Sequence, residues 1–182
     1  MLEHERFLIV KRPALSPFAS QYEILEASTQ RPVGIARAKA HKLAPLLDRV
    51  GQAKFLPMKL EAYETEDEPL VFIVRRNIGF LRGQARIADA DDHRLGRLLM
   101  RGSTAKAGFW ILDRQNFLFV TGEFVVERSA FALRSVEGAE LATWQLCKQE
   151  LLIDFDSTLQ EQPLAKMLLL GAALALDMIF PL

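Results

Sequence analysis

The segment from Leu164 to Phe180 restricts the fold most, because it predicts a helix that is apolar on every side. Pro163 stands at a first helical position and Pro181 ends the run. About 17 helical residues would span roughly 25 Å, and lipid or protein must surround them. A membrane span needs about 20 apolar residues. The uncharged run here extends only from Met167 to Leu176, which favours a buried core helix over residues 164–180.

The rest of the chain is predicted to form short β-strands. Pieces rich in Val, Ile, Leu and Phe are separated by Gly, Pro, Asp and Asn, which is typical of strands joined by hairpins. A short helix is expected only over residues 41–50, where the helical spacing is interrupted by Pro45. The expected strands are residues 7–11, 22–26, 33–38, 55–61, 70–78, 84–88, 94–101, 109–112, 117–124, 130–134, 140–146 and 151–155.

Together, the hairpins and the helix indicate a barrel. Consecutive hairpins predict an antiparallel meander that closes into a barrel or folds into a sandwich. The apolar helix favours the barrel, because a closed barrel of about twelve strands is wide enough to enclose it. We therefore expect a mainly β protein, a single domain over residues 1–182, in which an antiparallel barrel of about twelve strands encloses the C-terminal helix.

Composition excludes several classes of function. The 23 basic and 23 acidic residues cancel, which argues against nucleic acid as a partner. The single Cys147 allows neither an intramolecular disulfide nor a cysteine-built zinc site. The charged first residues are not those of a signal peptide. These features fit a cytoplasmic protein that is peripheral to a membrane at most.

The sequence indicates no catalytic residues, so we expect a binding protein without enzymatic activity. The residues from Asp89 to Arg94 begin like a calcium-binding loop but lack its Gly and its Glu, which predicts a hairpin turn. Ser103 and Lys106 have the spacing of an acyl-enzyme motif without its companion motifs. The three histidines, His4, His41 and His93, are too scattered to suggest a metal site or a catalytic triad.

Local charge is less balanced than the total. Residues 75–106 carry eight basic and three acidic side chains. Hairpin strands could gather the basic ones on one face of the barrel, where anionic lipid would attract them. The alternative is a solvated face on which Arg and Asp pair across strands. The candidate surface consists of Arg75, Arg76, Arg82, Arg86, Arg97 and Arg101.

Asp177 is predicted to be a buried charge near the C-terminal end of the helix. A carboxylate there opposes the helix dipole and needs a partner inside a barrel. Lys166 cannot supply it, because eleven residues separate the two by about 16 Å along the helix. We expect either backbone and hydroxyl donors or a barrel arginine, and the candidate arginines are Arg37, Arg86 and Arg97.

The helix carries Lys166, a Gly171–Ala172 step and Asp177, and shorter motifs precede it at residues 109–113, 120–122, 131–133 and 141–144. In composition and order these motifs resemble those of the phospholipid scramblases. That family shares a twelve-stranded barrel around a C-terminal helix with the tubby C-terminal domain and the plant LURP-one-related proteins. The resemblance covers roughly residues 20 to 180.

The resemblance implies association with phospholipid membranes, phospholipid redistribution and calcium binding before the helix. The matching acidic residues are Glu150, Asp154 and Asp156, although the family's opening acidic pair is not reproduced and a solvated strand face is the alternative. The family's proline-rich extension and cysteine cluster are missing as well, since Cys147 stands alone. The other function left open is an intracellular regulatory barrel that recognises protein or nucleic acid through the arginine-rich face.

Overall fold

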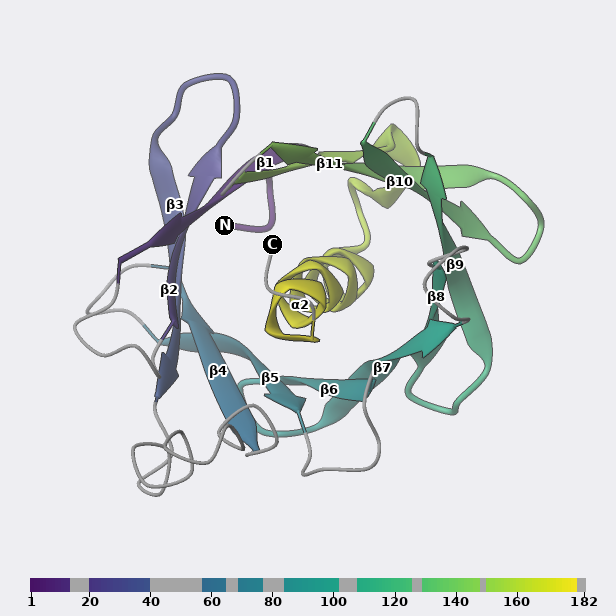
Figure 1. Ribbon diagram of the computed structural model, residues 1–182, viewed down its shortest axis with the longest axis horizontal. Coiled ribbons are helices and arrows are strands. Elements are labelled where there is room, and N and C mark those ends of the chain that lie inside the picture. The colour runs from purple at the N-terminus through teal and green to yellow at the C-terminus, as the bar shows by residue number, and fades with distance from the viewer. Residues whose placement is uncertain are drawn as a thin grey trace.

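The strands of the protein form one closed antiparallel barrel (Figure 1). The computed structural model describes residues 1–13, 20–39, 57–64, 69–76, 84–101, 108–125, 129–147 and 150–179. Each strand pairs with its neighbours in sequence, and β12 pairs with β1 to close the ring. The strands are β1 (Arg6–Arg12), β2 (Ser20–Glu26), β3 (Pro32–Lys39), β4 (Met58–Tyr63), β5 (Leu70–Arg76), β6 (Gln84–Asp89), β7 (Arg94–Arg101), β8 (Gly108–Asp113), β9 (Leu118–Val125), β10 (Ala130–Ser135), β11 (Glu140–Cys147) and β12 (Glu150–Phe155).

The expected barrel of about twelve strands is thereby confirmed, and the expected strands match the observed ones to within a few residues. The residues from Asp89 to Arg94 form the expected hairpin turn between β6 and β7. The helix expected over residues 41–50 lies outside the described residues, as does the Ser103–Lys106 motif.

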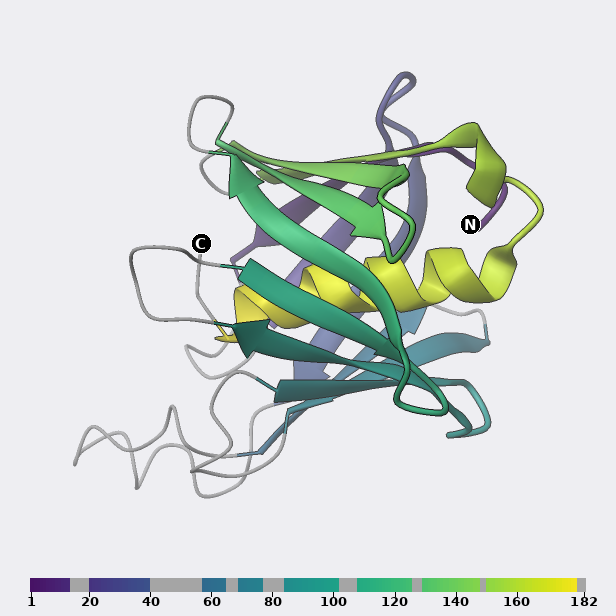
Figure 2. The ribbon, with the colours of Figure 1, turned by 90° about the vertical axis from the view of Figure 1, so that its right-hand side faces the viewer.

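Helix α2 (Pro163–Ile179) runs lengthwise through the barrel (Figure 2). A short 3-10 helix, η3 (Ser157–Leu159), leads into it from β12. Every residue of α2 from Lys166 to Met178 is buried, so the barrel supplies the apolar surroundings that the sequence requires. The expected core helix is confirmed, and no helix among the described residues is long and apolar enough to cross a membrane.

The helix lies off centre, against β5, β6 and β7 (Figure 1). Small residues allow this close approach: a Cβ atom at Gly171 would lie 2.7 Å from Cγ2 of Ile87 in β6. Large aromatic side chains contribute to the core around it. Phe109 of β8 stacks on Trp144 of β11 with 5.1 Å between ring centroids, and Phe131 packs on Phe109 at 5.3 Å. Side-chain volume therefore sets the position of the helix.

Lys166 joins the start of the helix to the first residues of the chain. Its side chain is fully buried, and its Nζ donates hydrogen bonds to the carbonyl oxygens of Leu2 at 3.1 Å and His4 at 2.9 Å. Burial lowers the pKa of Lys166, and the charge of Glu5 opposes this effect. As expected, Lys166 is thus held without any contribution from Asp177.

Candidate functional site

Four basic side chains stand side by side on the outer surface of β4, β5, β6 and β7. Arg86 is the register partner of both Arg75 and Arg97. Arg75 is in turn the register partner of Lys59. Their sequence neighbours on each strand include a fully buried inward residue, and alternation therefore directs the four side chains outward. We call Lys59, Arg75, Arg86 and Arg97 the basic row.

The basic row is not explained by the stability of the barrel. Like charges placed directly opposite each other on neighbouring strands are destabilising, typically by a few tenths of a kcal/mol to about 1 kcal/mol for each pair. The row contains three such pairs in succession. The alternative interpretation of this region, a solvated face on which Arg and Asp pair, holds in part, because Arg75 forms an ion pair with Asp92 at 2.7 Å. Lys59 forms one with Glu61 of its own strand at 2.6 Å. Within the row itself, however, the register places basic residues opposite one another.

A cavity opens beside the row, with about 170 Å³ of space for water-sized molecules. Most of its lining is positively charged. The lining residues are Arg75, Gln84, Ala85, Arg86, Arg94 and Arg97. Guanidinium and amide groups are hydrogen-bond donors, so the cavity suits an anion such as phosphate or carboxylate.

Arg94 reaches the cavity because of a β-bulge. Ile87 pairs with Gly96 but Ala88 pairs with Arg94, which leaves Leu95 as the extra residue in β7. Two residues three positions apart on a regular strand point to opposite faces. The bulge cancels this alternation and places Arg94 and Arg97 on the same cavity.

Part of the positive charge is balanced by Asp92 in the turn between β6 and β7. Nη1 of Arg75 lies 2.7 Å from both carboxylate oxygens of Asp92. Nη2 of Arg86 donates to the main-chain oxygen of Asp92 at 3.1 Å. The hydrogen bond from Arg75 lowers the pKa of Asp92; desolvation opposes this, and the charges of Arg75, Arg86 and Lys59 add to it.

Arg97 has no such balance. It forms no ion pair with any carboxylate in the described part of the chain. The Nε atoms of Arg97 and Arg94 are buried and have no hydrogen-bond partner among the described residues. Buried donors are normally satisfied, and these two belong to arginines that line the cavity, which makes them candidate contacts for an anion.

The other predicted arginines lie elsewhere. Arg76 points into the barrel, where its Nη1 donates to the carbonyl oxygen of Met178 at the end of α2, so its expected place on the surface patch is wrong. Arg101 lies on β7 with its guanidinium 5.0 Å from the ring centroid of Trp110, away from the cavity lining. Arg82 lies outside the described residues.

Sequence reasoning missed two residues of the site. Lys59 joins the basic row only through the register of β4 with β5, which the sequence does not reveal. Arg94 was counted in the basic region but not selected, and the bulge that turns it toward Arg97 has no clear sequence signal. Among the selected residues, Arg75, Arg86 and Arg97 are brought together.

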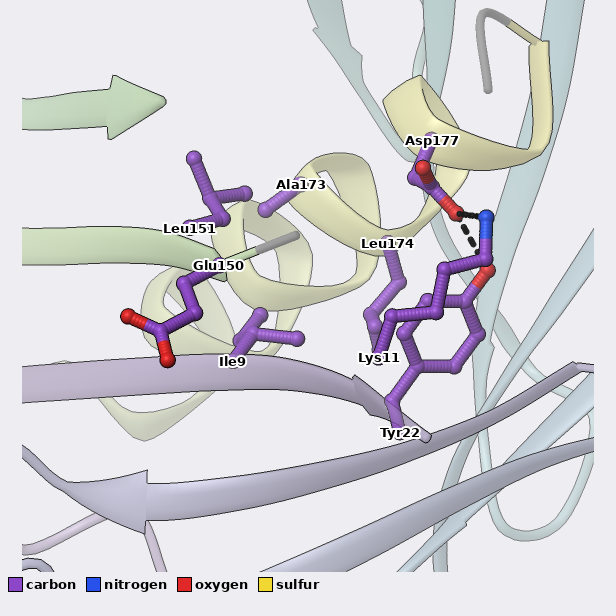
Figure 3. Close-up of a pocket in the computed structure, with 8 residues that line it drawn as sticks. All are labelled: Ile9, Lys11, Tyr22, Glu150, Leu151, Ala173, Leu174 and Asp177. Atoms are coloured by element: carbon purple, nitrogen blue, oxygen red, sulfur yellow. Dashed lines mark hydrogen bonds and ion pairs between the residues drawn. The ribbon is translucent and has the colours of Figure 1, made fainter. Parts of the chain in front are cut away.

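Asp177 is buried at the other end of the helix from Lys166, as predicted, with an exposed fraction of 8%. Its Oδ2 accepts hydrogen bonds from Nζ of Lys11 at 2.8 Å and from the hydroxyl of Tyr22 at 2.6 Å (Figure 3). The expected hydroxyl donor is therefore present as Tyr22. Lys11, which points inward from β1, supplies a cation to Asp177 where one of the three candidate arginines was expected.

The reason for this correction is strand alternation. Arg37 stands between the inward residues Ala36 and Ala38, and Arg86 and Arg97 belong to the outer basic row. None of the three therefore points toward the helix, whereas Lys11 and Tyr22 do.

The cavity around Asp177 is too small for a ligand. Its space for water-sized molecules is about 20 Å³, enough for about one water. The residues that line it are Ile9, Lys11, Tyr22, Glu150, Leu151, Ala173, Leu174 and Asp177 (Figure 3). We assign the Lys11–Tyr22–Asp177 cluster to holding the helix in the barrel.

This cluster predicts how Tyr22 ionises. Burial raises the pKa of Tyr22 well above its ordinary value of 10.0, and the charge of Asp177 and its hydrogen bond to Tyr22 add to the effect. The raised pKa stabilises the fold below pH 10 and loses this contribution as the pH rises beyond it. Tyrosinate absorbance from Tyr22, measured as the difference between the wild type and Tyr22→Phe, should therefore appear only as circular dichroism shows unfolding. Ionisation of Tyr22 near pH 10 in the folded barrel would contradict this.

The residues expected to bind calcium do not come together. Asp154 forms an ion pair with Arg6 at 3.2 Å. Asp156 caps η3 by accepting the main-chain N–H of Thr158 at 2.9 Å. Glu150 lies roughly 13 Å along β12 from Asp154. Because no group of three or more Asp, Glu, His or Cys residues in the described ranges is arranged to hold a metal ion, the expected set is not assembled.

Comparison with known proteins adds no assignment: the chain matches no family model, and no curated protein is significantly similar to it.

Proposed function

We propose that the protein is a non-enzymatic, scramblase-like barrel that binds phosphate groups of anionic phospholipids through the basic row and its cavity. The observation that carries the proposal is Arg97, whose buried Nε has no partner among the described residues and whose side chain lines a cavity with three other arginines. Guanidinium groups bind phosphate oxygens in pairs, with more geometric specificity than lysine provides. A part in phospholipid redistribution belongs to the same proposal.

The position of the basic row supports a membrane surface as the partner. The strands that carry the row, β4 to β7, are neighbours in the barrel wall (Figure 1). The row therefore has a width of about 14 Å at 4.8 Å per strand. A surface of this width can meet several lipid headgroups at once. Each basic residue near an anionic membrane contributes about 1 kcal/mol to binding.

Membrane contact through the barrel wall also agrees with the way in which α2 is held. Lys166 fastens the start of the helix, and Arg76 and Asp177 fasten its end. Release of the helix into lipid would break these contacts and expose its apolar surface, so the proposal assigns lipid recognition to the outer face.

Vesicle binding tests the proposal. We expect the protein to sediment with phosphatidylcholine vesicles that contain phosphatidylserine, to leave pure phosphatidylcholine vesicles unbound, and to bind less as salt increases. Arg97→Glu should weaken binding about 30-fold, because it removes one favourable charge and adds one unfavourable charge of about 1 kcal/mol each.

Arg134→Glu is the matched control. Arg134 is an exposed arginine of β10, three strands away from β7 around the barrel, so its reversal changes the net charge equally outside the row. If the two variants lose the same affinity for the vesicles, the effect comes from net charge alone and the proposed site is wrong. If the protein binds neither kind of vesicle, a protein or nucleic-acid partner of the arginine-rich face becomes the better proposal.

A further inference from the structure

Asp92 presents three oxygen atoms to the basic row. Its two carboxylate oxygens both lie 2.7 Å from Nη1 of Arg75, and its main-chain oxygen accepts from Arg86. A phosphate group would offer the same two arginines a similar set of acceptors. Asp92 therefore occupies the position of an anion beside a cavity lined by Arg94 and Arg97, whose Nε atoms have no hydrogen-bond partner among the described residues. Nη2 of Arg94 donates to Oδ1 of Asn116.

The backbone holds Asp92 in this position. Its φ angle is +65°, in the left-handed region that Asp and Asn adopt more readily than most other residues. Its N–H donates to the carbonyl oxygen of Asp89 at 3.1 Å, which closes the turn. Only the side chain, 44% exposed, needs to rotate for the carboxylate to leave Arg75.

We propose that Asp92 is a built-in competitor of the anionic ligand: its carboxylate neutralises Arg75 in the free protein and leaves when a phosphate group binds. The inference rests on the proposed function and adds its regulation. This exchange lowers the affinity for phosphate, since the ligand must displace Asp92 from Arg75 before it can bind there. Arg97 and Arg94 receive the ligand, and Arg75 joins them once Asp92 has moved.

Asp92→Asn tests the exchange, because asparagine keeps the left-handed turn and removes the competing charge. The matched control is Asp91→Asn, which removes the same charge from the same turn. Asp91 is exposed and forms no ion pair within the described ranges. We expect Asp92→Asn to tighten binding to phosphatidylserine vesicles about fivefold, as loss of a well-formed exposed ion pair allows, and Asp91→Asn to tighten it less than about twofold.

Two binding measurements distinguish a lipid headgroup from free phosphate as the source of the phosphate group. Vesicles report on the lipid headgroup, and inorganic phosphate, followed by isothermal titration, reports on the free ion. Tighter binding of either probe by Asp92→Asn than by Asp91→Asn supports the exchange. Equal binding by the two variants overturns it while the proposed function stands, provided that Arg97→Glu still weakens binding. If wild type and both variants bind neither probe, the proposed function fails and the exchange fails with it.

Discussion

Replacement of Gly171 by leucine is expected to lower the free energy of unfolding by about 3 kcal/mol, at the upper end of the usual cost of overpacking a core. Even a Cβ atom at this position would lie 2.7 Å from Cγ2 and 3.1 Å from Cγ1 of Ile87. Ile87 is fully buried in β6, so its side chain can give way only by displacing other core atoms. The gain in helix propensity from replacing glycine, about 1 kcal/mol, is too small to compensate. Urea denaturation measures the difference.

Ile87→Ala provides the control for this prediction. On its own it leaves a cavity in the wall and costs roughly 2 to 5 kcal/mol. Combined with Gly171→Leu it makes room for the new side chain, so the double variant should lose less stability than the sum of the two single losses, by at least about 1 kcal/mol. Simple additivity would show that the helix does not pack on Ile87 as described.

The second large effect is expected at the other end of the helix. Lys11→Met should cost about 3 kcal/mol, because it removes the ammonium that lies 2.8 Å from a buried carboxylate. Asp177 is buried, whereas Lys11 is 32% exposed at its side chain. Methionine keeps the packing of the lysine stem against the ring of Tyr22, over which the Lys11 ammonium lies at 5.9 Å. The loss can therefore be assigned to charge.

A double-mutant cycle isolates the pair. In the background of Asp177→Asn, the amide oxygen can still accept the hydroxyl of Tyr22, and no buried charge remains to be compensated. Lys11→Met should then cost less than about 1 kcal/mol, as expected for a polar contact without a buried ion. The same cost in both backgrounds would mean that Lys11 contributes packing alone and that Asp177 is neutralised by another group.

These expectations differ in how far the sequence alone could reach. The buried helix and the barrel followed from the chain because the segment from Leu164 to Phe180 is apolar on every side. The sequence predicted that Asp177 has a partner, since a buried charge must be compensated. It did not predict which residue that partner is. The strand alternation of Lys11 and Tyr22 is visible in sequence, but which strands face the end of the helix depends on barrel closure and on the position of α2.

The candidate site also depends partly on the sequence and partly on the tertiary structure. Local composition determined that a basic region lies between residues 75 and 106 and that its strands alternate. Only the tertiary structure decided which basic side chains meet: the register placed Lys59, Arg75, Arg86 and Arg97 in one row, the bulge at Leu95 brought Arg94 to it, and Arg76 turned inward to the helix. The physical reason is the period of two in a strand, because a shift of one residue in register or one inserted residue exchanges the inner and outer faces.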